Sequence, residues 1–271
     1  MVKVSIIMGI YNCEDTLEEA INSILKQTFK NWELIMCDDA SIDDTYKIAF
    51  SFSKKYSNIH VYKNKINLGL NKTLNKCLKY AKGTYIARMD GDDISLPQRL
   101  EKEYLFLEAN PQYSIVSTPM IHFDENGDFA IGKVINKPTK YDLIKATPFC
   151  HAPCMVKKEA FDAVKGYSEE NKTLRVEDYD LWVRMMKLNY KGYNLNEPLY
   201  KMRDDRKALN RRKFKYRINE FYIKVKIFKD FKLPLRYFIY TFRPILVGMM
   251  PKNIYKCFHI FKLDREREKN D

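Results

Sequence analysis

The chain has 271 residues, 45% of them hydrophobic and 14% aromatic, which is enough to bury a full core in one catalytic domain. Its 9 glycines and 10 prolines give no sign of disorder, and its 6 cysteines are scattered, which argues for reduced core residues and excludes a disulfide framework. The formal net charge is +13, with 21 basic and 8 acidic residues after Tyr200, so the first 200 residues hold 27 of each. The whole excess of positive charge therefore lies in the last quarter of the chain.

Strands and helices alternate through the first part of the chain. Apolar runs predict strands at residues 2–8, 33–37, 59–62 and 84–87, and apolar residues at helical spacing predict helices over about 14–25, 43–55 and 71–81. This alternation predicts a mostly parallel, doubly wound α/β sheet with the first strand at its centre and with ligands at the carboxyl ends of the strands. Because Met1 leads straight into the first strand, we expect no signal peptide and a cytoplasmic location.

Three carboxylates, Asp90, Asp92 and Asp93, directly follow the fourth predicted strand. Negative side chains this close repel one another, and hard oxygen ligands of this kind suit Mg²⁺ or Mn²⁺, which usually bind one or two carboxylates together with substrate phosphates. Turn formation at a strand end is the alternative explanation of the Asp-Gly-Asp sequence. The cluster therefore indicates a divalent cation held against a diphosphate.

A second pair of acids, Glu177 and Asp178, precedes an apolar series at helical spacing that includes Trp182. This arrangement places both carboxylates at a helix N-terminus, where the helix dipole alone favours negative charge. A carboxylate at the mouth of a site is also suited to act as a general base. The pattern leaves both explanations open.

The region 201–271 combines basic residues with aromatic and aliphatic ones. Such a region can contact nucleic acid, lie on an anionic membrane, or pack on the rest of the protein with a solvated basic face. Its segment 233–250 is apolar but contains Pro234, Arg236, Arg243 and Pro244, so it is suited to the membrane interface and poorly suited to span a bilayer. We expect association with an anionic membrane surface and no nucleic-acid partner.

Several motifs together resemble glycosyltransferase family 2, the inverting sugar transferases with a GT-A fold. They occur in order over roughly the first 200 residues, at residues 4–12, 27–29, 38–41, 67–70, 87–97, 151–153, 166–167 and 177–182. The Gln-x-x-Arg-Trp motif of processive synthases is absent after Asp178, which argues for the addition of one sugar per encounter. The resemblance implies a GT-A domain at 1–200, with a nucleotide-binding half at 1–95 and an acceptor half at 96–200.

The resemblance also implies roles for individual residues. Asp92 is expected to bind Mn²⁺ or Mg²⁺ directly, with Asp90 at the ribose or a metal-bound water and Asp93 supporting the loop. The nucleotide is expected to contact Tyr11 through its base and Asp39 through an imide N–H, with Asn67, Gly69 and Lys72 on the phosphate side. Asp178 is the expected general base, with His151, Glu177 and Trp182 in the acceptor region. Apart from the resemblance, the charges of Arg203, Arg206, Arg211 and Arg212 are suited to a lid over the diphosphate, and a solvated basic linker is the simpler interpretation.

These observations imply a metal-dependent inverting glycosyltransferase that moves one sugar from a nucleotide donor, expected to be a UDP-sugar, to a glycan or polyprenyl-linked acceptor in bacterial surface polysaccharide synthesis. We expect it to lie on the inner face of the cytoplasmic membrane. One alternative is a sugar-nucleotide pyrophosphorylase, which should open with a Gly-rich basic loop that residues 9–15 lack. A non-enzymatic membrane or nucleic-acid binding module is the other, and it leaves the acids at strand and helix ends unexplained.

Overall fold

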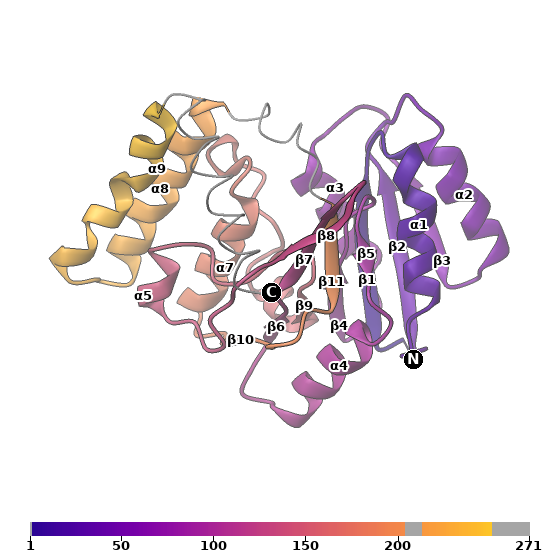
Figure 1. Cartoon of the computed structure of the whole chain (residues 1–271), viewed down its shortest axis with the longest axis horizontal. Helices are drawn as coiled ribbons and strands as arrows, with labels where there is room; N and C mark the ends of the chain where they lie inside the picture. Colours follow the sequence, from indigo (N-terminus) through magenta and orange to yellow (C-terminus); the bar gives the residue numbers. More distant parts are fainter. Residues whose placement is uncertain (1, 204–212, 251–271) are drawn as a thin grey trace.

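The computed structural model describes residues 2–203 and 213–250, and a seven-stranded sheet lies at its centre (Figure 1). The strand order is β10-β6-β9-β4-β1-β2-β3, so the first strand is central, as predicted. Neighbouring strands are parallel except at β9, which runs antiparallel to β4 and β6. The predicted mostly parallel α/β sheet is therefore confirmed. Its strands are β1 (Val4–Ile10), β2 (Trp32–Asp38), β3 (Ile59–Lys63), β4 (Tyr85–Arg88), β6 (Ile115–Ser117), β9 (Met155–Lys157) and β10 (Gly192–Asn194).

The helices of the first half also lie where the sequence predicts them. They are α1 (Glu14–Leu25), α2 (Thr45–Lys55) and α3 (Leu70–Tyr80). Helix α2 begins two residues later than predicted, because the acids before it form its entry turn. The Asp43 carboxylate accepts a hydrogen bond from the Thr45 backbone N–H at 3.1 Å, and Asp44 occupies the N-cap position without a side-chain capping hydrogen bond.

Both faces of the sheet are buried, which explains the continuous apolar runs of its central strands. Alternate side chains of β1 enter opposite cores: Ile7 packs with residues of α3 and α7, whereas Ile6 and Met8 pack with residues of α1. The carboxyl ends of β1, β2 and β4 meet at one edge of the sheet, because all three run parallel. The loops that follow them therefore share one side of the molecule.

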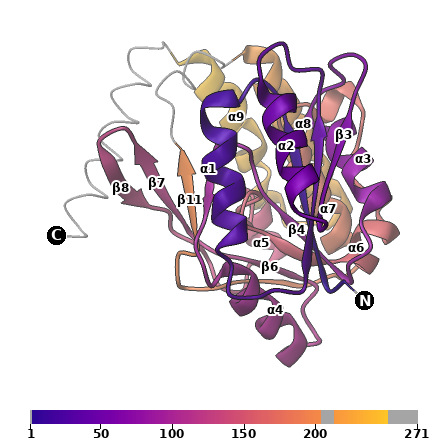
Figure 2. The ribbon, with the colours of Figure 1, turned by 90° about the vertical axis from the view of Figure 1, so that its right-hand side faces the viewer.

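A second sheet, which the sequence pattern did not predict, lies beside the first in the order β5-β11-β7-β8. Figure 2 shows β7, β8 and β11 set to one side of α1. Strand β11 pairs with β5 and β7, which lie far from it in the sequence. The strands are β5 (Ile94–Ser95), β7 (Met120–Asp124), β8 (Gly127–Ile131) and β11 (Tyr200–Arg203), and the helices of this half are α4 (Arg99–Ala109), α5 (Lys140–Leu143), α6 (Lys158–Ala163), η1 (Asn171–Thr173) and α7 (Glu177–Lys187).

The described part of the C-terminal region contains α8 (Phe214–Asp230), the short η3 (Leu235–Tyr237) and α9 (Ile239–Met249), which pack together beside α7 (Figure 1). Ile223 and Ile227 of α8 belong to the main core. The buried Lys224 ammonium donates hydrogen bonds to the carbonyls of Ile144 at 2.7 Å and Lys145 at 2.8 Å. Helix α8 is thus an integral part of the folded body.

None of the helices within residues 2–203 and 213–250 combines the length and apolar character needed to cross a bilayer. The five cysteines in these ranges are all free thiols, as expected, and Cys257 lies outside the described residues.

Candidate active site

The three acids after β4 form one compact cluster. Asp90, Asp92 and Asp93 each offer a carboxylate oxygen, and these atoms lie within 4.8 Å of one another. Gly91 lets the loop pack closely, since a Cβ there would lie 3.0 Å from the Cys13 sulfur. The donor set is hard and negatively charged, and Asp92 is exposed, so the cluster fits a divalent cation such as Mg²⁺ or Mn²⁺.

Hydrogen bonds to Asp93 fix this acid loop. Its buried carboxylate accepts a bond from the Tyr200 hydroxyl at 2.9 Å and from the Arg203 backbone N–H at 2.8 Å. Burial and the neighbouring charges of Asp90 and Asp92 raise the pKa of Asp93 to about 8, and burial raises that of Asp92. Concentrated negative charge is therefore costly here without a cation.

Arg88, the last residue of β4, is a buried cation beneath the site, with 5% of its surface exposed. Its guanidinium donates a hydrogen bond to Asp90, and within the described residues its buried Nε has no hydrogen-bond partner. Burial raises the pKa of Asp92, Glu177 and Asp178, and the charge of Arg88 partly opposes that rise at all three. One buried arginine thus acts electrostatically on both groups of acids.

The predicted nucleotide residues lie on neighbouring loops at the same sheet edge. Asp39 follows β2 and is 4% exposed; one of its oxygens accepts hydrogen bonds from the Asn64 amide and the Leu68 N–H, and the other from the Gly69 N–H, all at 2.8 Å. Gly69 has a φ of 86°, a conformation that glycine adopts without strain. Asp39 and Gly69 are therefore in direct contact.

The remaining residues on the predicted nucleotide side are accessible. Tyr11 follows β1 and is 48% exposed. Asn67 and Lys72 are also exposed, beside the loop that Asp39 holds. Asp38 points elsewhere: its buried carboxylate accepts a hydrogen bond from the Ser41 N–H at 3.2 Å and so stabilises the turn after β2.

The second acid pair occupies the first turn of α7, where the helix was predicted to begin. Burial raises the pKa of Glu177 and of Asp178. Behind them, Trp182 is fully buried and contacts the ring of His151 edge-on at 6.0 Å between centroids. The His151 Nε2 lies 2.8 Å from the Tyr167 hydroxyl, and burial and the Arg88 charge lower the pKa of His151 well below its usual value, which favours a neutral ring.

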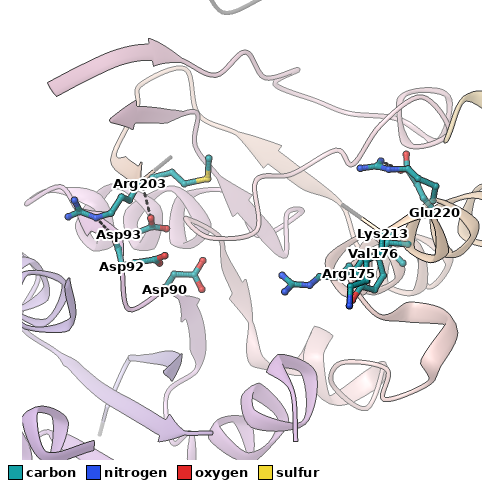
Figure 3. A pocket seen from close by; sticks show the side chains of 11 residues that line it. Asp90, Asp92, Asp93, Arg175, Val176, Arg203, Lys213 and Glu220 are labelled. Atoms are coloured by element: carbon teal, nitrogen blue, oxygen red, sulfur yellow. Dashed lines mark hydrogen bonds and ion pairs between the residues drawn. The ribbon is translucent and has the colours of Figure 1, made fainter. Parts of the chain in front are cut away.

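A pocket of about 500 Å³ joins the acid cluster to the C-terminal region (Figure 3). Arg203 lies at its acid side, where its side chain donates to the Asp92 carbonyl at 3.0 Å and to Glu19 at 2.6 Å. Arg206, Arg211 and Arg212 lie outside the described residues. The other lining residues were not singled out from the sequence; they are Arg175, Val176, Met202, Lys213, Tyr216, Arg217 and Glu220.

Only a weak sequence signal points to these missed residues. The excess of basic residues after Tyr200 includes Lys213 and Arg217, but the pattern does not indicate which cations face the site. Arg175 directly precedes the short segment that leads into α7, and its position in the pocket results from tertiary packing.

Comparison with known proteins assigns the chain to a family. Residues 5–164 match the model described as glycosyl transferase family 2. The chain is 45% identical over 267 residues to EpsE of Bacillus subtilis (strain 168), a glycosyltransferase by name, with 98% of this chain and 96% of the relative covered. It is 34% identical over 193 residues to WfaP of Escherichia coli, named UDP-Glc:alpha-D-GlcNAc-diphosphoundecaprenol beta-1,3-glucosyltransferase, with 71% and 74% covered.

Solved structures share the fold. TarS 1–349 of S. aureus in complex with UDP-GlcNAc has a TM-score of 0.70 at 20% identity, covering 84% of this chain and 67% of TarS 1–349. The mannosyltransferase PcManGT from Pyrobaculum calidifontis, in complex with GDP-Man and Mn²⁺, has a TM-score of 0.62 at 18% identity, covering 91% and 68%.

Proposed function

Because the chain belongs to glycosyl transferase family 2 and is a glycosyltransferase of polysaccharide biosynthesis, we propose that it catalyses metal-dependent, inverting transfer of one sugar. The donor is a UDP-sugar, and the acceptor is a glycan linked to a polyprenyl diphosphate. The observation that carries the proposal is the pocket, which joins the cation-binding acids to Val176, directly before Glu177 and Asp178. A site of this kind brings a donor diphosphate and a general base to the same reacting centre.

Asp92 and Asp90 hold Mg²⁺ or Mn²⁺ in this proposal. The cation supplies charge stabilisation to the departing nucleoside diphosphate, without requiring a proton transfer. The Mn²⁺ bound with GDP-Man by the mannosyltransferase of similar fold supports a divalent ion but does not distinguish the two metals. Arg88 orients Asp90 through its hydrogen bond, so the carboxylate keeps one position as charge develops.

Tyr11 and Asp39 bind the nucleobase in this proposal, and Asn67, Gly69 and Lys72 line the phosphate side. The Asp39 oxygen that accepts the Gly69 N–H has a second lone pair, which leaves room for an imide N–H of uracil. The exposed ring of Tyr11 offers a stacking surface. The UDP-sugars named for TarS and WfaP support uracil as the base.

Asp178 removes the proton from the acceptor hydroxyl as that oxygen attacks the anomeric carbon from the face opposite the diphosphate. Burial raises the pKa of Asp178 and so strengthens it as a base, while the charge of Arg88 favours its ionised form. His151 and Trp182 form a rigid, neutral wall on the acceptor side.

The test of this function is a donor screen. Nucleotide sugars are incubated singly with the protein, Mn²⁺ and a GlcNAc-diphosphate-lipid acceptor, with inorganic diphosphate added in a parallel arm. The products are identified by mass spectrometry, and NMR gives their anomeric configuration. We expect one donor to give an acceptor extended by one sugar with an inverted anomeric centre. Formation of a sugar 1-phosphate from a nucleotide sugar and diphosphate would instead identify a pyrophosphorylase and reject the proposal.

We further propose that α8 and α9 seat the protein on an anionic membrane surface. Both helices, with the segment between them, expose a set of apolar side chains that we call the apolar face, namely Phe214, Ile218, Tyr222, Leu235, Phe238, Ile239, Phe242, Leu246 and Met249. On α9 these residues recur at helical spacing, so they share one side. Basic residues of the same segments, including Lys215, Lys232 and Arg236, add attraction to anionic lipids of about 1 kcal/mol each.

Substitution within the apolar face is expected to weaken vesicle binding. Each buried leucine-sized side chain contributes about 1.5–3 kcal/mol, so Ile239→Ser with Leu246→Ser should lower partitioning into anionic vesicles by at least about tenfold. The measurement is co-sedimentation at low and high salt. Leu105→Ser is the matched control, because Leu105 is 56% exposed on α4 and Leu246 is 66% exposed on α9. Equal sedimentation of all three proteins would reject the membrane role.

A further inference from the structure

Three carboxylates and three cations line opposite sides of the pocket, with Arg203 beside the carboxylates and Glu220 beside the cations (Figure 3). Asp90, Asp92 and Asp93 line one side. On the other side lie Arg175, from the loop before α7, and Lys213 and Arg217, from the beginning of α8; we call these three the cation wall. We propose that the cation wall is a subsite for the diphosphate of the lipid-linked acceptor. This inference rests on the proposed function, since it deepens the account of the same site.

Two members of the cation wall have no anionic partner among the described residues. Arg175 and Lys213 are exposed, and neither forms an ion pair with a carboxylate of the described residues, although the charge of Arg175 opposes the rise in the pKa of nearby Glu177. Arg217 pairs through one guanidinium nitrogen with Glu220 at 2.6 Å, which leaves its other donors available. By contrast, the Arg203 guanidinium on the acid side already donates hydrogen bonds to the Glu19 carboxylate and the Asp92 carbonyl.

Arg175 lines the pocket from a strained backbone position. Its φ is 66°, a left-handed conformation that is unfavourable for a residue with a side chain. Figure 3 shows the Arg175 guanidinium extending from the α7 side toward the acid cluster. A strained residue that presents a charge to a cavity is typical of a binding site.

The position of the wall favours the acceptor over the donor as the source of the diphosphate. The donor diphosphate belongs with the cation at Asp90 and Asp92, on the opposite side of the pocket. In the acceptor named for WfaP, the diphosphate is attached to the same GlcNAc that receives the new sugar. The acceptor diphosphate therefore lies within one sugar of the reacting hydroxyl and needs a cationic site inside or beside the same pocket.

Helix α8 also connects the cation wall to the apolar face. Its residues Phe214, Ile218 and Tyr222 are exposed at successive turns, while Lys213, Tyr216, Arg217 and Glu220 line the pocket. A lipid whose chain lies along the apolar face would hold its diphosphate at this helix. Guanidinium groups bind phosphate oxygens in paired hydrogen bonds, which suits Arg175 and Arg217 to that group.

The test compares two acceptors and two variants. Arg175→Gln with Lys213→Gln removes the two unpaired cations, and Lys79→Gln is the matched control, because Lys79 is an exposed cation on α3 that neither lines the pocket nor belongs to the basic segments of α8 and α9. The acceptors are a GlcNAc-diphosphate-lipid and an alkyl GlcNAc without the diphosphate. Hydrolysis of the donor without acceptor is measured in parallel.

We expect the double variant to raise KM for the diphosphate acceptor by about tenfold to a hundredfold, the loss expected for hydrogen bonds to charged groups. Transfer to alkyl GlcNAc, donor KM and donor hydrolysis should stay within about twofold of wild type. Parallel loss of donor binding would assign the cation wall to the donor diphosphate and overturn the inference, as would equal losses with both acceptors or an unchanged KM. Failure of the wild-type protein to transfer any sugar would defeat the proposed function itself, a result visible before the variants are compared.

Discussion

Asp178→Asn is expected to lower turnover by at least about 10²-fold while leaving donor affinity close to that of wild type. The reason is that the amide cannot take the acceptor proton, and general-base catalysis contributes about 10² to 10⁴ in rate. The measurement is steady-state transfer together with nucleotide titration by calorimetry. A turnover number equal to wild type would place the base elsewhere, and Glu177 would then be tested.

The first turn of α7 offers a matched control for this substitution. Asp180 is also an acid of this turn, but its buried carboxylate pairs with Arg184 at 2.6 Å and Lys226 at 3.0 Å. Asp180→Asn should therefore lower thermal stability and leave the turnover of the folded protein nearly unchanged. Opposite effects of the two substitutions would separate catalysis from helix stability.

The pH dependence of kcat/KM should identify the same group. A base works only when it is deprotonated, and burial raises the pKa of Asp178, so the rate should fall at low pH with a midpoint above the usual aspartate range. The charge of Arg88 opposes this rise in the pKa of Asp178, whereas the charge of Glu220 adds to it. Arg88→Met should move the acid limb to higher pH, and an unmoved limb would exclude Arg88 from this role.

The first half of the fold was predictable because its signals are local. Central strands such as β1 are continuous apolar runs buried on both faces, and helices such as α1 repeat apolar residues every three or four positions. The second sheet gave no comparable signal, since β5 has two residues and β11 finds its partners at distant positions in the sequence. Short strands of this kind are specified by tertiary packing rather than by their own pattern.

The residues of the candidate site also fall into two groups, those that a local sequence pattern indicates and those that only tertiary packing brings together. Asp90 and Asp92 directly follow a strand, and Asp178 lies in the first turn of a helix. Both positions could be predicted from the local sequence. Arg175 and Lys213 come together only because α8 packs beside α7, and no local pattern encodes that contact. Arg88 does carry a local signal, because a charge at the end of an otherwise apolar strand is costly unless it has a partner.

Removal of the divalent cation is expected to abolish transfer, and Asp92→Asn is expected to reproduce the loss. Several kcal/mol of charge stabilisation on the departing diphosphate correspond to a fall in turnover of about 10²-fold or more. The measurement is transfer in excess chelator and after restoration with Mn²⁺ or Mg²⁺. Full activity in chelator would show that the reaction needs no metal.

The role of Asp92 can also be tested through the melting temperature of the protein, without measuring catalysis. Burial and Asp90 raise the pKa of Asp92, which means that the folded protein disfavours its charged form. The neutral amide of Asp92→Asn should therefore leave the melting temperature of the metal-free protein unchanged or higher, since one repelling charge is gone. Mn²⁺ with UDP should raise the melting temperature of wild type by mass action and have little effect on the variant. Equal stabilisation of both proteins would remove Asp92 as the metal ligand, because a ligand that binds the cation directly cannot be replaced by an amide without loss of affinity.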